Sequence, residues 1–263
     1  LAVVLDGSGL STEEMQHFTN WTNLSEATFL LPPTQAGADY QVRIFCPGRE
    51  LPFAGHPTLG TCRAWLQQGH TPRVPGLVVQ ESAQGLVQIE HQGETLAFAA
   101  PPLQRSKPSP ALVPLVASAL GLRPHQIQAA QLLDNGPVWL GLLLDSAETV
   151  LGLTPDHARL KDLGQDVGVI HIAPDAGANP ERPGAVVRAF AAPMGNPEDP
   201  VTGSLNASLA QWLIAEGLAP TRYLVAQGEC LGRAGRVYIR QDAQGQVWVG
   251  GHTVTCIEGT ALL

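Results

Sequence analysis

The feature that most constrains this sequence is the stretch Glu50-Leu-Pro-Phe-Ala-Gly-His-Pro-Thr-Leu-Gly60, which sets an ionisable carboxylate just ahead of a helix start. Pro57 suits the first helical turn, because its missing N–H would have no partner there. Apolar residues then recur at helical spacing and Gly69 provides a stop, which predicts a helix over residues 57–68. The open end of such a helix presents unpaired N–H groups and a partial positive charge. A carboxylate facing it is a candidate reaction centre.

A second copy of this arrangement occurs at Asp199-Pro-Val-Thr-Gly-Ser204, where apolar residues again follow and Gly217 marks the stop. We interpret Glu50 and Asp199 as matching carboxylates, each at a similar distance ahead of its helix. The pattern therefore predicts two half-sites facing one cleft. The helices beginning near Pro57 and Ser204 are expected to be the central helices of two similar units, related by a rough two-fold.

The rest of the chain predicts strands around these helices. Ser11-Thr-Glu-Glu14 is a capping box, and the prolines within residues 101–114 indicate a linker. Helical patterns follow near 110–121 and 124–133, and a helix capped at Thr154 is expected. Val138–Leu144 is a continuous apolar run typical of a central strand, and four strands are expected over 222–260. We predict two domains, 1–104 and 105–263, with the last strand returning to the first domain.

Composition and residue spacing exclude several classes of protein. With 263 residues, 14% charged residues and a net charge of −8, the chain lacks the basic surface that nucleic-acid binding requires. Its four cysteines show no paired spacing, which indicates a reducing cytoplasm and buried apolar roles. The eight histidines form no ligand motif, and the partial phosphate loop after Gly55 lacks its lysine, so neither a metal nor a nucleotide is expected.

No membrane or secretory segment is predicted either. No apolar run approaches the roughly 20 residues that span a bilayer, and no basic segment precedes the apolar residues 1–5. The first strand is expected to begin almost at residue 1.

Both long motifs resemble the signatures of the phenazine-biosynthesis isomerase (PhzF-like) family. Further segments fit the resemblance, namely 23–29, 42–47 and Gln227-Gly228. The resemblance spans nearly the whole chain. It implies an α/β (mixed α+β) protein of the diaminopimelate epimerase-like fold, in which two pseudo-symmetric domains each roll a mixed sheet around a central helix. Family members begin with further residues, including an Asn-Pro, so the start here is expected to be truncated.

The resemblance also assigns the two carboxylates. From spacing alone, a solvated loop residue is the more common role for a glutamate such as Glu50, and a helix cap or first-turn dipole partner is a common role for Asp199. In the family, the glutamate that opens the first motif transfers the proton, and the aspartate helps to bind and polarise the substrate. Leu51 and Phe53 could desolvate Glu50 and make it a better base near neutral pH.

The helix starts supply the candidate binding groups. Gly55 and His56 on one side, and Gly203 and Ser204 on the other, could hold a substrate carboxylate through backbone N–H groups and the serine hydroxyl. No nucleophile elbow surrounds Ser204. The family usually continues Ser-Ala-His, whereas this chain has Leu205-Asn206 after the serine. The family's additional histidine has no placed equivalent here, since His70 and His91 align too loosely.

These observations predict a cofactor-independent isomerase that abstracts and returns a proton on a small carboxylate-bearing substrate, with the active site between the domains. Epimerases related to the family use two cysteines in such a cleft. No cysteine stands at either carboxylate position here, so the resemblance implies one-base isomerisation in preference to two-base racemisation. The resemblance implies a homodimer. The alternative is a non-catalytic carboxylate-binding or protein-interaction protein that retains the fold, and a change such as Asn206 could accompany lost chemistry.

Overall fold

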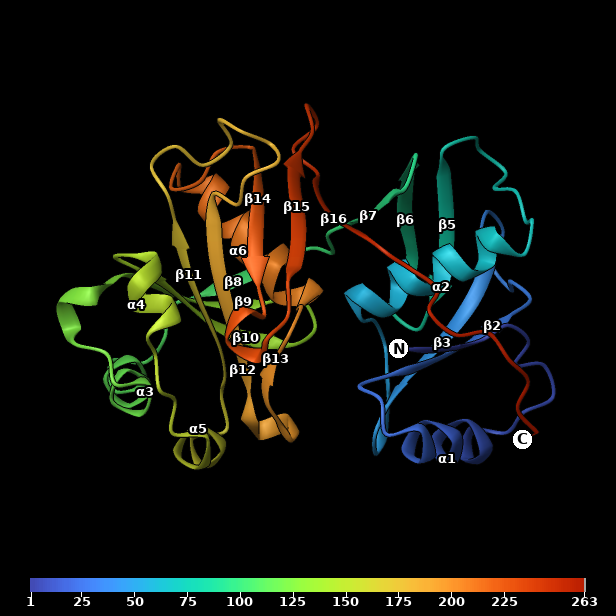
Figure 1. Ribbon diagram of the computed structural model, residues 1–263, viewed down its shortest axis with the longest axis horizontal. Helices are drawn as coiled ribbons and strands as arrows, with labels where there is room; N and C mark the ends of the chain where they lie inside the picture. Colours follow the sequence, from blue (N-terminus) through green and yellow to red (C-terminus); the bar gives the residue numbers. More distant parts are fainter. Residues whose placement is uncertain (263) are drawn as a thin grey trace. The chain divides into compact units, whose positions relative to one another are not determined.

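A computed structural model describes residues 1–262, which form two compact units. Unit 1 comprises Leu1–Ala99 together with the segment that begins at Gly250, and unit 2 comprises Ala100–Val249. The chain therefore leaves unit 1 once and returns to it through strand β16 (Val247–His252). Figure 1 shows both units as sheets with helices packed against them. This is the mixed α/β architecture that the sequence predicts.

The sheet of unit 1 has the strand order β1-β2-β3-β5-β6-β7, with β4 paired to β3. Its β1–β2 and β3–β5 pairs are parallel. The β2–β3, β3–β4, β5–β6 and β6–β7 pairs are antiparallel. Two helices, α1 and α2, accompany this sheet. The element bounds are β1 Ala2–Val4, α1 Thr12–Thr22, β2 Ala27–Leu31, β3 Tyr40–Cys46, β4 Arg49–Leu51, α2 Gly55–Gln67, β5 Leu77–Ser82, β6 Gly85–Gln92 and β7 Thr95–Ala99.

Neighbouring residues of β2 contact the two different helices of unit 1. Phe29 packs with Met15 of α1 in a buried cluster, whereas the Thr28 hydroxyl lies 2.7 Å from that of Thr61 in α2. Successive strand residues point to opposite faces, so α1 and α2 cover opposite faces of this sheet. The predicted capping box at the start of α1 is confirmed by both of its hydrogen bonds, between Ser11 and Glu14.

Unit 2 repeats this plan with the strand order β16-β15-β14-β12-β11-β10-β9-β8, and β13 pairs with β12. Here β10–β11 and β12–β14 are the parallel pairs, matching β1–β2 and β3–β5 in unit 1. The bounds are β8 Gln104–Ser106, α3 Leu112–Leu120, β9 Ile127–Asp134, β10 Val138–Leu144, α4 Ala147–Leu151, α5 His157–Leu163, β11 Asp166–Ile172, β12 Ala185–Ala191, β13 Asn196–Asp199, α6 Gly203–Ala215, β14 Arg222–Gln227 and β15 Gly235–Gln241.

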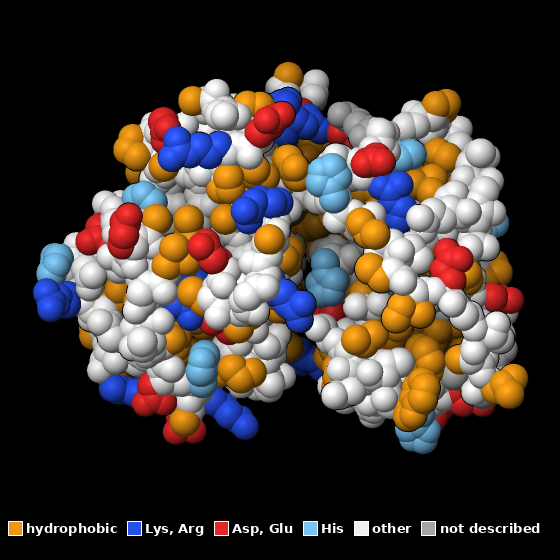
Figure 2. Space-filling model, viewed as in Figure 1, with side chains coloured by type: hydrophobic (Ala, Val, Ile, Leu, Met, Phe, Trp, Pro, Cys, Tyr) orange, Lys and Arg blue, Asp and Glu red, His pale blue; other side chains and the backbone are white. Residues whose placement is uncertain are grey.

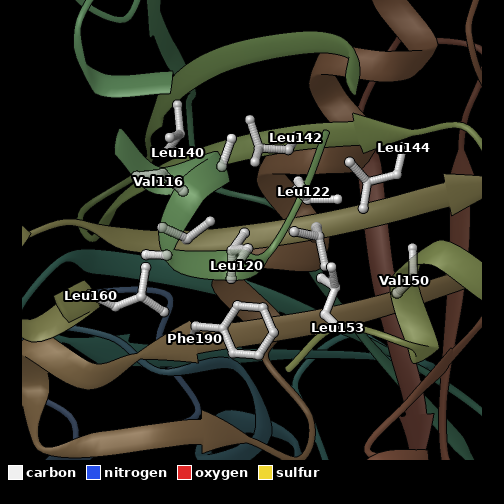
Figure 3. Packing of buried hydrophobic residues seen from close by; sticks show 14 of the residues in the cluster. Val116, Leu120, Leu122, Leu140, Leu142, Leu144, Val150, Leu153, Leu160 and Phe190 are labelled. Carbon is white, nitrogen blue, oxygen red and sulfur yellow. The ribbon is translucent and has the colours of Figure 1, made fainter. Parts of the chain in front are cut away.

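The core of unit 2 lies on both faces of β10. Leu140, Leu142 and Leu144 pack against α3, α4 and α5 in one large apolar cluster (Figure 3). On the opposite face lies α6, which is buried nearly all round, as expected of a central helix. At Gly168 of the neighbouring strand β11, an added Cβ would lie 2.2 Å from Leu205 of α6, so only glycine permits this packing. The apolar run 138–144 is thus a central strand, as predicted.

Two sequence predictions about elements are wrong. Residues 124–133 form a 3₁₀ turn, η1 (Pro124–Gln126), followed by strand β9, not a helix. β9 pairs with β8 and β10, and this pairing outweighs the helix propensity of an alanine- and glutamine-rich segment. Residues 222–260 hold three strands instead of four, since residues 253–260 have no regular structure. The helix expected at Thr154 is capped by Asp156.

The face drawn in Figure 2 shows no concentration of positive charge among the described residues. On the visible face of each unit, basic and acidic side chains are intermixed (Figure 2), in keeping with the net charge of −8. Within residues 1–262, no helix combines the length and apolar character needed to cross a bilayer.

Candidate active site

Glu50 lies on the short strand β4, opposite Phe45 of β3. Both of its carboxylate oxygens accept hydrogen bonds from one guanidinium, with Arg43 Nε 2.8 Å from Oε1 and Nη2 2.6 Å from Oε2. The Glu50 side chain is 33% exposed and that of Arg43 is 25% exposed. This paired geometry fixes the direction of the carboxylate while solvent still reaches it.

Arg43 is itself held from several sides. Its Nη2 also donates to the Thr12 hydroxyl at 3.0 Å, and its guanidinium carbon lies 5.1 Å from the centre of the Phe45 ring. The hydrogen bonds to Glu50 raise the pKa of Arg43 above its ordinary value; partial burial opposes this effect and the charge of Glu50 adds to it. Arg43 is therefore a permanent cation beside Glu50.

The surroundings of Glu50 differ from the apolar enclosure that the sequence suggests. Phe53 is buried and packs edge-on against Phe98, with ring centroids 5.3 Å apart. The group that faces the carboxylate is the guanidinium of Arg43. Phe53, three positions after Glu50, therefore points into the core, and the polar group of Arg43 contacts the carboxylate instead.

Helix α2 begins at Gly55, two positions ahead of its predicted start. Its capping residue Ala54 has no side-chain acceptor, so no side chain caps the first-turn N–H groups. His56 Nε2 lies 2.8 Å from Glu26 Oε2. That oxygen is buried without an aligned hydrogen bond, so the contact is one of proximity, and it becomes an ion pair when His56 is protonated. One ring nitrogen of His56 therefore lies beside Glu26.

Helix α6 begins at Gly203, and it also lacks a side-chain cap. Ser204 Oγ accepts a hydrogen bond from Trp139 Nε1 at 3.2 Å, and its carbonyl accepts one from Asn135 Nδ2 at 2.9 Å. The two helices thus share an uncapped N-terminus, which is a common way for proteins to bind anions.

Asp199 ends strand β13, four positions ahead of α6. Its Oδ2 accepts a hydrogen bond from the Thr202 hydroxyl at 2.6 Å, and its Oδ1 accepts one from Asn196 Nδ2 at 3.2 Å. Asp199, Gly203 and Ser204 thus belong to one β13–α6 segment of unit 2. Glu50, Gly55 and His56 belong to the corresponding β4–α2 segment of unit 1.

The structural counterpart of Glu50 is Glu198, so the interpretation that matched Glu50 with Asp199 is wrong. Glu50 lies five positions before Gly55, and Glu198 lies five before Gly203. Arg188 Nε and Nη2 donate to the Glu198 oxygens at 2.9 and 2.8 Å. The Arg188 guanidinium carbon lies 5.0 Å from the centre of the Phe190 ring, as Arg43 lies over Phe45.

Comparison with known proteins identifies the chain. A profile described as "PhzC-PhzF: Phenazine biosynthesis-like protein" matches residues 1–259. The chain belongs to this PhzF family. It is 33% identical to the trans-2,3-dihydro-3-hydroxyanthranilate isomerase of Pseudomonas aeruginosa and 32% identical to "Antisense-enhancing sequence 1" of Schizosaccharomyces pombe; each alignment covers 100% of this chain and 93% of the relative.

A solved structure shows the same fold. The Bacillus anthracis phenazine biosynthesis protein of the PhzF family superimposes with a TM-score of 0.78 at 22% identity, covering 95% of this chain and 89% of that one. The predicted family and its epimerase-like fold are therefore confirmed, and the chain is an isomerase of the PhzF family.

Sequence reasoning gave no role to several residues that contact the candidate residues or their counterpart in unit 2. Arg43 and Arg188 each stand two positions before a phenylalanine, and this Arg-x-Phe repeat ahead of each motif was the available signal. Glu26 lies within the 23–29 segment already noted for its family resemblance. Thr202 lies in the second motif and Gln227 in a segment that fits the same resemblance, but spacing could not show their contact, because the fold brings them together from separate elements.

Proposed function

We propose that the chain is a cofactor-independent isomerase that removes a proton from carbon on a small carboxylate-bearing substrate and returns it to a different atom. Glu50 is the general acid–base. The observation that carries this assignment is the exposure of Glu50, because a carboxylate held in one direction and open to solvent can meet a substrate.

The other site residues bind charge in this proposal. The uncapped N-termini at Gly55–His56 and Gly203–Ser204 hold the substrate carboxylate and the negative charge that spreads in an enol-like transition state. Asp199 orients the substrate in this proposal. We further propose that the protein is a homodimer, for which light scattering during size-exclusion chromatography is the measurement.

A single base suits this arrangement. Glu198 is placed in unit 2 as Glu50 is in unit 1, and it is buried in an ion pair with its side chain only 7% exposed. None of the four free cysteines stands at the position of Glu50 or of Asp199. Racemases that use two bases need a second group that can exchange a proton, and Glu198 is not accessible for that task.

The test is turnover of trans-2,3-dihydro-3-hydroxyanthranilate, the compound in the relative's name, with a panel of small carbon acids in deuterated water. NMR detects deuterium that enters a carbon position during turnover. We expect incorporation by the wild-type protein and its loss in Glu50→Gln. Incorporation by a folded Glu50→Gln protein at the wild-type rate would overturn the assignment of the base.

The second candidate is a carboxylate-binding protein without catalysis. One observation favours it: both oxygens of Glu50 are already engaged by Arg43, as those of Glu198 are by Arg188. In this case calorimetry would detect binding of a small carboxylate, and no deuterium would enter any compound of the panel. The same screen therefore separates the two functions.

A further inference from the structure

Gln227, at the end of β14, is a buried amide whose four hydrogen bonds are all made within unit 2. It is 2% exposed. Its Oε1 accepts from the backbone N–H of Thr202 at 3.2 Å and from Asn206 Nδ2 at 2.8 Å. Its Nε2 donates to the Asp199 carbonyl at 3.0 Å and to the Thr202 hydroxyl at 2.9 Å. Both ends of the amide are fully satisfied.

These contacts fix the direction of every proton in the chain of hydrogen bonds. The backbone N–H of Thr202 can only donate, so Gln227 must turn its oxygen towards that group and its NH₂ towards the Thr202 hydroxyl. The hydroxyl oxygen is then an acceptor for Gln227. Its single proton points to Asp199 Oδ2, 2.6 Å away. Asp199 therefore receives a donated proton in a defined direction.

Close backbone packing keeps this network in place. Gly228 has a φ of +89°, and an added Cβ there would lie 2.7 Å from the Pro200 carbonyl oxygen. At Gly235, an added Cβ would lie 2.5 Å from Val201 Cγ2. The β14–β15 connection therefore approaches the loop ahead of α6 as closely as glycine allows. This close packing fixes the distance between Gln227 and the Thr202 segment to which it hydrogen-bonds.

We propose that Thr202 and Gln227 are positioning residues that hold the Asp199 carboxylate in one rotamer for substrate binding. The proposal rests on the function given above, in which Asp199 orients the substrate. Thr202 acts directly on the carboxylate through its hydroxyl, and Gln227 acts through Thr202. Neither residue contacts the substrate.

Asn206 belongs to the same network. It is 2% exposed, and its Nδ2 donates both to the Thr202 carbonyl at 2.8 Å and to Gln227 Oε1. Its side chain therefore points into unit 2. Asn206, which stands where the family usually has histidine, is thus part of the network that supports Asp199 in this proposal.

Thr202→Val is the test, because it keeps the shape of the side chain and removes the hydroxyl. We expect kcat/KM in the isomerisation assay to fall by about ten- to a hundredfold, with most of the change in KM, since a hydrogen bond to a charged group is lost. A crystal structure of the variant should show Asp199 in another rotamer. Thr202→Ser, which keeps the hydroxyl, should return kcat/KM to within about threefold of wild type.

Thr61→Val is the matched control. Thr61 is a buried threonine of α2 whose hydroxyl bonds Thr28, so its loss should lower the Tm without changing kcat/KM. If Thr202→Val does not fold, Thr202→Ala, which also removes the hydroxyl, gives the same comparison.

The outcomes separate this inference from the proposed function. Wild-type kcat/KM in Thr202→Val, together with a clear loss in Asp199→Asn, overturns the positioning role and leaves the function standing. Wild-type kcat/KM in Asp199→Asn overturns the role of Asp199 in the proposed function itself. Loss in Thr202→Val, recovery in Thr202→Ser and no loss in Thr61→Val support the inference.

Discussion

Two arginine–glutamate pairs, one in each unit, have almost the same geometry and very different surroundings. Arg188 and Glu198 are 6% and 7% exposed, and Arg188 Nη1 also donates to the carbonyls of Val150 and Leu153. Burial works against the charge of Arg188, yet the bonds and the charge of Glu198 raise its pKa. The Arg43–Glu50 pair has the same two hydrogen bonds between guanidinium and carboxylate, but its side chains are a quarter to a third exposed.

The difference teaches that the pair is part of the folding plan and that exposure decides what else it can do. A fully enclosed ion pair satisfies its own charges and meets no substrate. A pair left partly open by its unit offers a carboxylate with a fixed direction. The first three predictions below test this comparison, and the fourth concerns Glu81, another carboxylate of unit 1; they run from the largest expected effect to the smallest.

Glu50→Gln should have the largest effect, on turnover alone. The change keeps the size of the side chain and removes the group that titrates, so the rate should fall on the order of 10²–10⁴-fold. Circular dichroism and thermal unfolding should show a native fold. Glu198→Gln serves as the control, and a similar fall in the rate per folded molecule of that variant would remove the distinction between the two pairs.

Glu198→Gln should have the largest effect on stability. It leaves the buried Arg188 without its counter-charge, which costs about 3–5 kcal/mol in the free energy of unfolding. Urea unfolding followed by tryptophan fluorescence measures this loss. A cost below about 1 kcal/mol would mean that water or another group compensates the charge of Arg188. The pair would then be less well shielded from solvent than its low exposed fraction indicates.

Arg43→Met should be much milder for stability than Arg188→Met. A partly exposed ion pair is worth about 0–1 kcal/mol, because solvent screens the charges. The expected loss for Arg43→Met is therefore within about 1 kcal/mol, measured by the same urea unfolding. Equal losses in the two variants would show that the two pairs contribute alike to folding.

Glu81→Gln should have the smallest effect, and one that depends on pH. Burial acts to raise the pKa of Glu81, but bonds from Thr34 and the backbone of Gln35 outweigh it and hold the pKa below 4.5. A lowered pKa in the folded state stabilises the protein above pH 4.5, and this stabilisation is lost as the pH falls through the folded value.

The urea midpoints of wild type and Glu81→Gln should therefore differ at pH 7 and converge in acid. A difference that stays constant with pH would assign the effect to packing. The ionisation of Glu81 would then make no contribution to the loss of stability in acid.

Much of the fold could be predicted, because its signals are local. The capping box of Ser11 and Glu14, the apolar run 138–144 and the two helix starts depend on neighbouring residues alone. Strand β9 could not be predicted in this way. Its conformation comes from hydrogen bonds to β8 and β10, and its own composition favours a helix.

The candidate site, like the fold, was predictable only where its signals are local in sequence. Motif spacing and family resemblance made Glu50 and Asp199 the candidates, but spacing could not show that Glu198 is the structural counterpart of Glu50. That equivalence depends on which residues of β13 face Arg188. Likewise, Gln227 joins Thr202 across 25 positions of the chain, a distance over which no local pattern operates.

The path of the backbone through β16 has a consequence for handling the molecule. Unit 2 is one uninterrupted segment, Ala100–Val249, whereas unit 1 is assembled from both ends of the polypeptide. In topology, unit 2 is an insertion within unit 1. Genetic excision can therefore release unit 2 as a single piece, but unit 1 needs its ends rejoined by a short artificial loop, because Gly250 lies against the backbone of Leu96 and Ala97.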